Sequence, residues 1–151
     1  MSAPRELRVG QGERARTYSL ARDRHAVHGP AARAVPDPIL VLEDGEIAVV
    51  GGEAAPPGAG PVYVTPAGGL VVPTGRVLLR YRSGTRALDQ APRLRDVGFE
   101  VERALDYAPE ALWVRPRGGG VADALESLPH LASLPGVEEA EPQLLLPRSL
   151  R

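Results

Sequence analysis

The chain has 151 residues, a formal net charge of −1 and no cysteine, which excludes disulfide bonds, thiol catalysis and thiolate metal sites. All 18 of its basic residues are arginines, so a Walker-type phosphate loop and Schiff-base chemistry, which both require lysine, are excluded as well. The charge balance does not suggest binding to nucleic acid. No apolar run has the form of a signal peptide or the length of a membrane span. We therefore expect a cytoplasmic protein that binds neither nucleic acid nor membrane.

Glycine and proline are unusually frequent, with 17 and 16 residues respectively. Helix interiors and central strands tolerate neither residue well, so we expect short secondary-structure elements. The hydrophobic fraction of 43% is nevertheless too high for a disordered chain. The composition therefore predicts a folded protein with many turns.

Residues 1–73 show the pattern of short strands separated by turns. The candidate strands are 5–9, 16–20, 39–42 and 46–50. Asp44-Gly45 lies between two β-rich runs and predicts a type I′ hairpin turn. A second hairpin is expected to turn around residues 66–69. We expect this region to form a small antiparallel β appendage.

Residues 74–147 have a different rhythm, with strands expected at 74–82, 99–105, 111–116 and 137–146. Within 74–82, Val77, Leu79 and Tyr81 alternate with Leu78 and Arg80, which predicts a half-buried strand. Helical spacing is found within 84–98, where Pro92 must kink or restart the helix, and again from Val121, where Pro129 should introduce a kink. The order βαββαβ predicts an α+β fold, a ferredoxin-like sandwich of a four-stranded antiparallel sheet and two helices. Residues 148–151 are assigned to a C-terminal tail. The helix-free face of such a sheet meets solvent or docks on a partner.

The sequence offers no set of catalytic groups, so we expect neither an enzyme nor a cofactor. His25 and His28 could bind a metal, but no third ligand has suitable spacing, and a pair of loop histidines is the simpler interpretation. The glycines at 118–120 could hold an anion at a helix start or simply connect a strand to a helix. Tyr81 and Trp113 could stack on RNA bases, although no RNA-binding motif surrounds them.

Three patterns in the second half together resemble a known family. Residues 80–84 match R-[FY]-x-x-G, residues 105–111 match L-x-Y-A-P-x-A, and residues 134–142 match L-P-G-V-E-x-A-E-P without a gap. These segments are similar to the propeptides of subtilisin-like serine proteases. The similarity extends over 74–147, about half of the chain, and continues more weakly upstream.

The resemblance implies a non-catalytic inhibitor, with a further role as a folding chaperone, of a subtilisin-like serine protease. It implies that the helix-free sheet face docks on the protease and that the C-terminal segment adds as a strand along the substrate cleft. The sequence shows neither the catalytic domain nor the export signal usual in the family, so we expect an inhibitor encoded separately from its protease, with which it forms a heterodimer. The protease-binding residues expected from this resemblance are Tyr107, Ala108, Pro109, Glu110, Trp113, Glu139, Glu141, Pro142, Gln143, Leu144, Leu145, Leu146, Pro147, Arg148, Ser149, Leu150 and Arg151.

A second hypothesis is a ferredoxin-like regulatory or ligand-binding module that associates with itself through its sheet. The role of residues 1–73 stays open between two alternatives. They either widen the protease interface or recruit another component.

Overall fold

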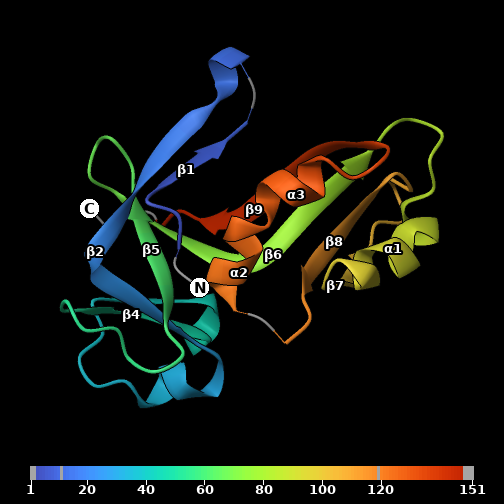
Figure 1. Ribbon diagram of the computed structural model, residues 1–151. Helices are drawn as coiled ribbons and strands as arrows, with labels where there is room; N and C mark the ends of the chain where they lie inside the picture. Colours follow the sequence, from blue (N-terminus) through green and yellow to red (C-terminus); the bar gives the residue numbers. More distant parts are fainter. Residues whose placement is uncertain (1–2, 11, 119, 148–151) are drawn as a thin grey trace. The chain divides into compact units, whose positions relative to one another are not determined.

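The computed structural model describes residues 3–10, 12–118 and 120–147 (Figure 1). Within these residues the strands form one nine-stranded antiparallel open sheet in the hydrogen-bonded order β3-β4-β2-β5-β6-β8-β7, with β1 against β2 and β9 against β6. The predicted fold class, a ferredoxin-like sandwich with a separate β appendage, is wrong. The reason lies in β6 (Leu70–Tyr81), which pairs with β5 through Leu70 and Val71 and with β8 through residues 77–80. One continuous strand therefore belongs to both sets of pairings, which makes a single mostly-β sheet.

The other strands are β1 (Glu6–Val9), β2 (Arg16–His28), β3 (Leu40–Leu42), β4 (Ile47–Gly51), β5 (Gly60–Val64), β7 (Phe99–Ala104), β8 (Ala111–Pro116) and β9 (Val137–Leu145). The α-helices are α1 (Ala91–Asp96), α2 (Val121–Glu126) and α3 (Leu128–Ala132). Short 3-10 turns are η1 (Gly12–Arg14), η2 (Gly29–Ala34), η3 (Glu43–Gly45) and η4 (Ala87–Gln90). In the part of the chain that the structure describes, no helix is long and apolar enough to cross a membrane.

The described chain divides into two compact units, and each has its own hydrophobic core. Residues 74–143 form unit 1, and residues 3–73 together with 144–147 form unit 2. Leu144 and Leu145 close strand β9, yet they belong to unit 2, whereas the rest of β9 belongs to unit 1. The C-terminal residues are thus part of the fold as far as Leu145.

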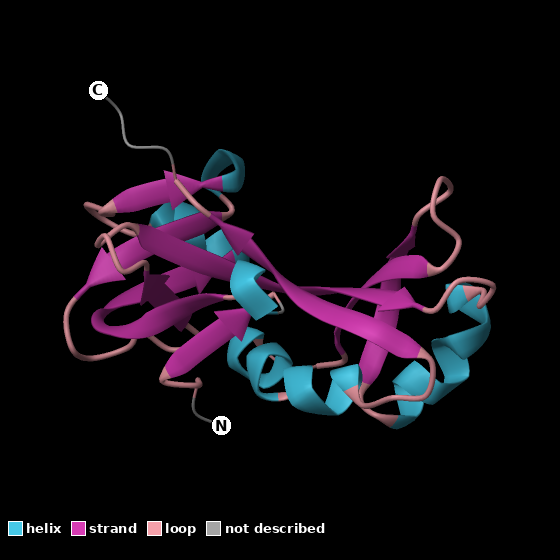
Figure 2. Cartoon of the chain, turned by 90° about the horizontal axis from the view of Figure 1, so that it is seen from above, coloured by secondary structure: helices cyan, strands magenta, loops and turns pink. Residues whose placement is uncertain are grey.

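The core of unit 1 follows from alternation along its strands. Val77, Leu79 and Tyr81 of β6 point to the buried face, together with Leu112 and Val114 of β8. The helices of this unit lie on that face of the strands (Figure 2), and their buried residues Leu94, Ala124 and Leu131 complete the cluster.

Both helix-breaking effects expected in unit 1 are confirmed. Pro92 lies in the first turn of α1, where its missing N–H costs no hydrogen bond, so the helix restarts there after η4. Pro129 likewise stands at the start of α3, which separates this helix from α2.

Unit 2 is built from antiparallel hairpins around the long strand β2. The predicted type I′ turn is confirmed: Asp44 and Gly45 have φ of 54° and 91°, and the Glu46 N–H donates to the Glu43 carbonyl at 3.0 Å. The second predicted hairpin is also confirmed, with β5 and β6 joined by residues 65–69. The core of unit 2 contains Ala26, Ile47, Val49, Val62 and Val72.

Candidate protein-binding surface

The helix-free face of unit 1 has a cross-strand apolar pair at its centre. Along β6 and β8 the residues that alternate with the core are Leu78 and Trp113, and their Cα atoms are direct partners in the antiparallel register. Both side chains are half-buried, because helices cover only the opposite face. The only tryptophan of the chain therefore lies on the face that was expected to dock on a partner.

Ion pairs surround this apolar pair on the same face. The Arg76 guanidinium lies 2.7 Å from Glu102, and that of Arg115 lies 2.7 Å from Glu100. Both arginine side chains are more than half exposed, so each pair contributes little to stability. They do fix long side chains in one geometry around Leu78 and Trp113.

Arg80 adds a third ionic contact, with two carboxylates of β9. Its guanidinium nitrogens lie 2.8 Å from Glu138 and 2.8 Å from Glu139. The hydrogen bond and the charge of Glu139, followed by those of Glu138, raise the pKa of Arg80. An apolar centre enclosed by ordered polar groups is the arrangement that concentrates binding energy at protein interfaces.

Strand β9 places the other predicted residues of this segment in ordered structure. Glu141 is half-buried, Pro142 is buried, and the Gln143 side-chain carbonyl accepts a hydrogen bond of 2.8 Å from the Thr74 hydroxyl. Leu145 packs on the core of unit 2. These residues are therefore held in the sheet, and their predicted contact with a protease stays a prediction.

The last predicted residues follow β9. Leu146 is 56% exposed and Pro147 is half-buried. Arg148, Ser149, Leu150 and Arg151 lie outside the described residues. Leu146, directly after β9, is therefore the first predicted residue of this C-terminal segment whose apolar side chain is mostly accessible.

The predicted residues 107–110 lie in the turn between β7 and β8. The Tyr107 side chain is 85% exposed. Backbone hydrogen bonds to carbonyl groups of the turn hold the turn itself in place. The Pro109 carbonyl accepts from the Ala87 N–H at 2.9 Å, and the Glu110 carbonyl accepts from the Tyr81 N–H at 2.8 Å. The turn itself is rigidly anchored, and the Tyr107 ring projects from it.

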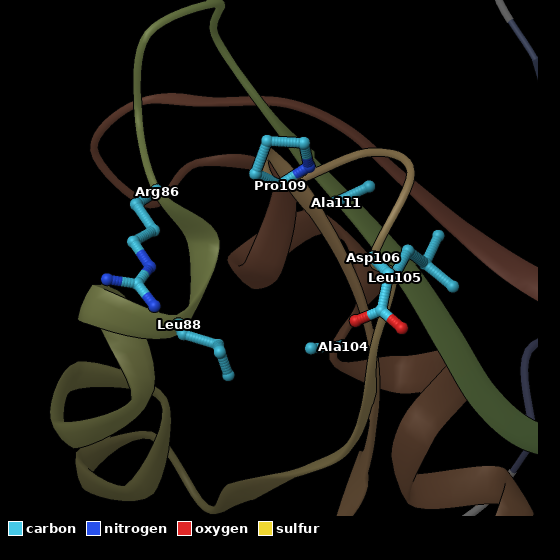
Figure 3. A pocket seen from close by; sticks show the side chains of 7 residues that line it. All are labelled: Arg86, Leu88, Ala104, Leu105, Asp106, Pro109 and Ala111. Atoms are coloured by element: carbon cyan, nitrogen blue, oxygen red, sulfur yellow. The ribbon is translucent and has the colours of Figure 1, made fainter.

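Beside this turn is a small open pocket of about 200 Å³, between η4 and the ends of β7 and β8 (Figure 3). Arg86 and Asp106 contribute charged groups to its lining, and Leu88, Leu105 and Pro109 contribute apolar surface. Among the described residues neither charged group forms an ion pair. The pocket is therefore small and open to solvent.

The structure brings no catalytic or metal-binding groups together in its described part, where no cluster of three or more His, Cys, Asp or Glu side chains is found. His25 and His28 are three residues apart on β2 and therefore point to opposite faces of the strand. His25 Nε2 lies 2.9 Å from the Gly52 carbonyl oxygen. His28 Nε2 is buried with no hydrogen-bond partner, and burial lowers the pKa of this imidazole. The two histidines do not form a metal site.

Sequence reasoning identified Trp113 but missed the residues around it. Leu78 and Arg80 were already placed opposite the core face by alternation within 74–82, and that signal could have assigned them to the docking surface. The pairing of Glu100 and Glu102 with arginines on other strands depends on the strand order, so no local pattern could have indicated it.

Comparisons with known proteins identify no relative. No family model, no curated protein and no solved structure matches the chain.

Proposed function

We propose that this chain is a non-catalytic protein-binding module that inhibits a subtilisin-like serine protease in the cytoplasm, docking through the helix-free face of unit 1. The observation that carries the proposal is the Leu78–Trp113 pair at the centre of that face. Tryptophan at a centre ringed by ordered polar groups is typical of binding hot spots. The class of the partner, a subtilisin-like serine protease, is inferred from the resemblance of residues 134–142 to the closing signature of the propeptides of these proteases.

The mode of inhibition that we propose differs in one point from the mode that the resemblance implies. Because Gln143, Leu144 and Leu145 are held in β9, we assign contact with the substrate cleft to the residues that follow Leu145. The sheet face then provides most of the binding energy. A chaperone role would use the same face, because the helix-free face would guide the folding of the protease surface on which it packs.

The test is inhibition of purified subtilisin-like proteases by the whole chain, measured as residual hydrolysis of a chromogenic peptide. Trp113→Ala should weaken inhibition about 30-fold or more, as expected for loss of a hot-spot tryptophan. Val41→Ala is the control, because Val41 is 51% exposed on β3 of unit 2 and is not part of the proposed docking face. This control should inhibit as the parent chain does.

Two results would overturn the proposal. One is full protease activity at saturating concentrations of the folded chain across the panel. The other is equal inhibition by the Trp113→Ala and parent chains. A dimer that depends on Trp113, without affinity for any protease, would instead favour a regulatory module that associates with itself.

A further inference from the structure

Unit 2 carries an exposed apolar pair on an edge strand. β3 stands at one end of the strand order, and Ile39, directly before β3, and Val41 within it are 49% and 51% exposed on the same side of the chain. They are two of only five large hydrophobic residues exposed in the described part of the chain. Half-exposed aliphatic side chains on a sheet edge are a common feature of interaction surfaces.

The chain on both sides of this pair is acidic, while Arg24 of β2 lies near Ile39 beside Gly51 and is paired with Asp23. Residues 36–53 contain five acidic residues and no basic one. Asp37 lies two residues before the pair, and Glu43, Asp44 and Glu46 follow it in η3 and in the residue between η3 and β4. Of these, Glu46 is paired with Arg33 at 3.2 Å. We call residues 37–46 the acidic end of unit 2.

The opposite end of unit 2 is basic. Residues 8–16 contain three arginines and one acidic residue, a local net charge of +2 in a chain whose total is −1. Arg8, Arg14 and Arg16 are exposed at the β1–β2 hairpin, and in the described residues none of them forms an ion pair. We call residues 8–16 the basic end of unit 2.

The two ends cannot meet within one molecule, because strand β2 separates them. Its first residue, Arg16, pairs with β1, and its last, His28, pairs with Ile47 beside the η3 turn. At roughly 3.3 Å per residue, a 13-residue strand separates these positions by about 40 Å. Figure 1 shows β1 and β4 at opposite ends of β2.

We propose that unit 2 associates head to tail, with the basic end of one copy seated on the acidic end of the next. Arginines of the basic end pair with the carboxylates of Glu43 and Asp44 of the neighbouring copy, and Val9 covers part of the exposed Ile39–Val41 pair. Charge complementarity selects the second copy as the occupant, since this chain itself presents both surfaces. The contact is heterologous, so it builds chains or a closed ring rather than a simple two-fold dimer.

A nucleic acid is a weaker match for the basic end. The acidic end lies on the same unit and would repel a long polyanion. The proposal uses unit 2 alone, so its failure and the failure of the protease-inhibitor proposal are separate results.

The test is analytical ultracentrifugation of the full chain at about 50 mM and about 500 mM NaCl, since exposed ionic contacts are screened by salt. We expect the mean mass to rise with protein concentration at low salt, and the association constant to fall at least about tenfold at high salt. Arg14→Gln/Arg16→Gln blocks the basic end, and Glu43→Gln/Asp44→Asn blocks the acidic end. Asparagine at 44 tolerates the local φ of 54°.

Each blocked variant alone should stay monomeric, whereas an equimolar mixture should form a 1:1 dimer and nothing larger, because one intact contact remains. Arg93→Gln/Arg95→Gln on α1 of unit 1 is the matched control and should associate as the parent does. A parent chain that is monomeric under all conditions, or association that neither blocked variant reduces, would overturn the proposal. Binding of the basic end to a 20-base-pair DNA duplex without self-association would likewise refute it.

Discussion

Truncation at the C-terminus separates the residues that build the fold from those available to a partner. Deleting residues 143–151 removes the end of β9, whereas deleting 146–151 leaves the strand complete. Both shortened chains lack the segment that we assign to the protease cleft. Their difference in stability therefore measures what Gln143, Leu144 and Leu145 contribute to the fold.

The magnitude follows from three contacts. Leu144 and Leu145 are half-buried, so each contributes about 1 kcal/mol, roughly half the value of a fully buried leucine. The hydrogen bond from the Thr74 hydroxyl to Gln143 contributes about 1 kcal/mol. The longer deletion should therefore lower the free energy of unfolding by roughly 3 kcal/mol, whereas the shorter one should change it by less than about 0.5 kcal/mol.

Urea titration followed by circular dichroism measures both values. Equal stability of the two truncated chains would refute the assignment of residues 143–145 to the fold. The same samples test the inhibitor proposal. If the residues after Leu145 enter the cleft, the shorter deletion should weaken inhibition without loss of stability.

Three further substitutions test the cores of the two units. Leu112→Ala, at a fully buried position of unit 1, should lower the free energy of unfolding by about 3 kcal/mol in urea titration. Tyr63→Phe removes the 2.7 Å hydrogen bond to the Pro4 carbonyl and should lower the free energy of unfolding by about 1 kcal/mol. Burial raises the pKa of Tyr63 to about 12, so ultraviolet titration should find this hydroxyl protonated at pH values where an ordinary tyrosine ionises. Burial lowers the pKa of His28 in the folded state. The contribution of its neutral imidazole to the free energy of unfolding is therefore complete above the ordinary pKa of 6.5 and is lost as the pH falls below that value. Unfolding measured on both sides of that pH should show this loss, and His28→Gln should reduce it; an unchanged pH dependence would contradict the assignment.

Local chemistry determined the turns and breaks of the chain. Asp44-Gly45 forms the predicted type I′ turn because both residues tolerate positive φ, and Pro92 and Pro129 begin helices as their rings require. These outcomes depend on a few neighbouring residues, so a pattern read along the chain was sufficient. Alternation within 74–82 likewise indicated which side chains of β6 are buried.

Strand length and strand partners depended on the tertiary structure. β2 was expected to end near residue 20 but continues to His28, because β4 and β5 provide hydrogen-bond partners on both sides of its second half. The same effect extends β6 across both units, which overturned the predicted four-stranded fold. Backbone pairing is indifferent to most side chains, so no local sequence signal marks where a strand exchanges one partner for another.

The sequence by itself determined that this protein lacks cysteine and lysine chemistry, that Pro92 and Pro129 interrupt its helices, and that its tryptophan lies in a strand. Only the tertiary structure decided what surrounds that tryptophan, because the ion pairs of Arg76, Arg80 and Arg115 join residues on different strands. It also decided that the end of β9 belongs to unit 2 and that β2 separates the basic from the acidic residues of that unit. These features are set by strand order and register, which arise from hydrogen bonds and burial between distant segments rather than from local preference.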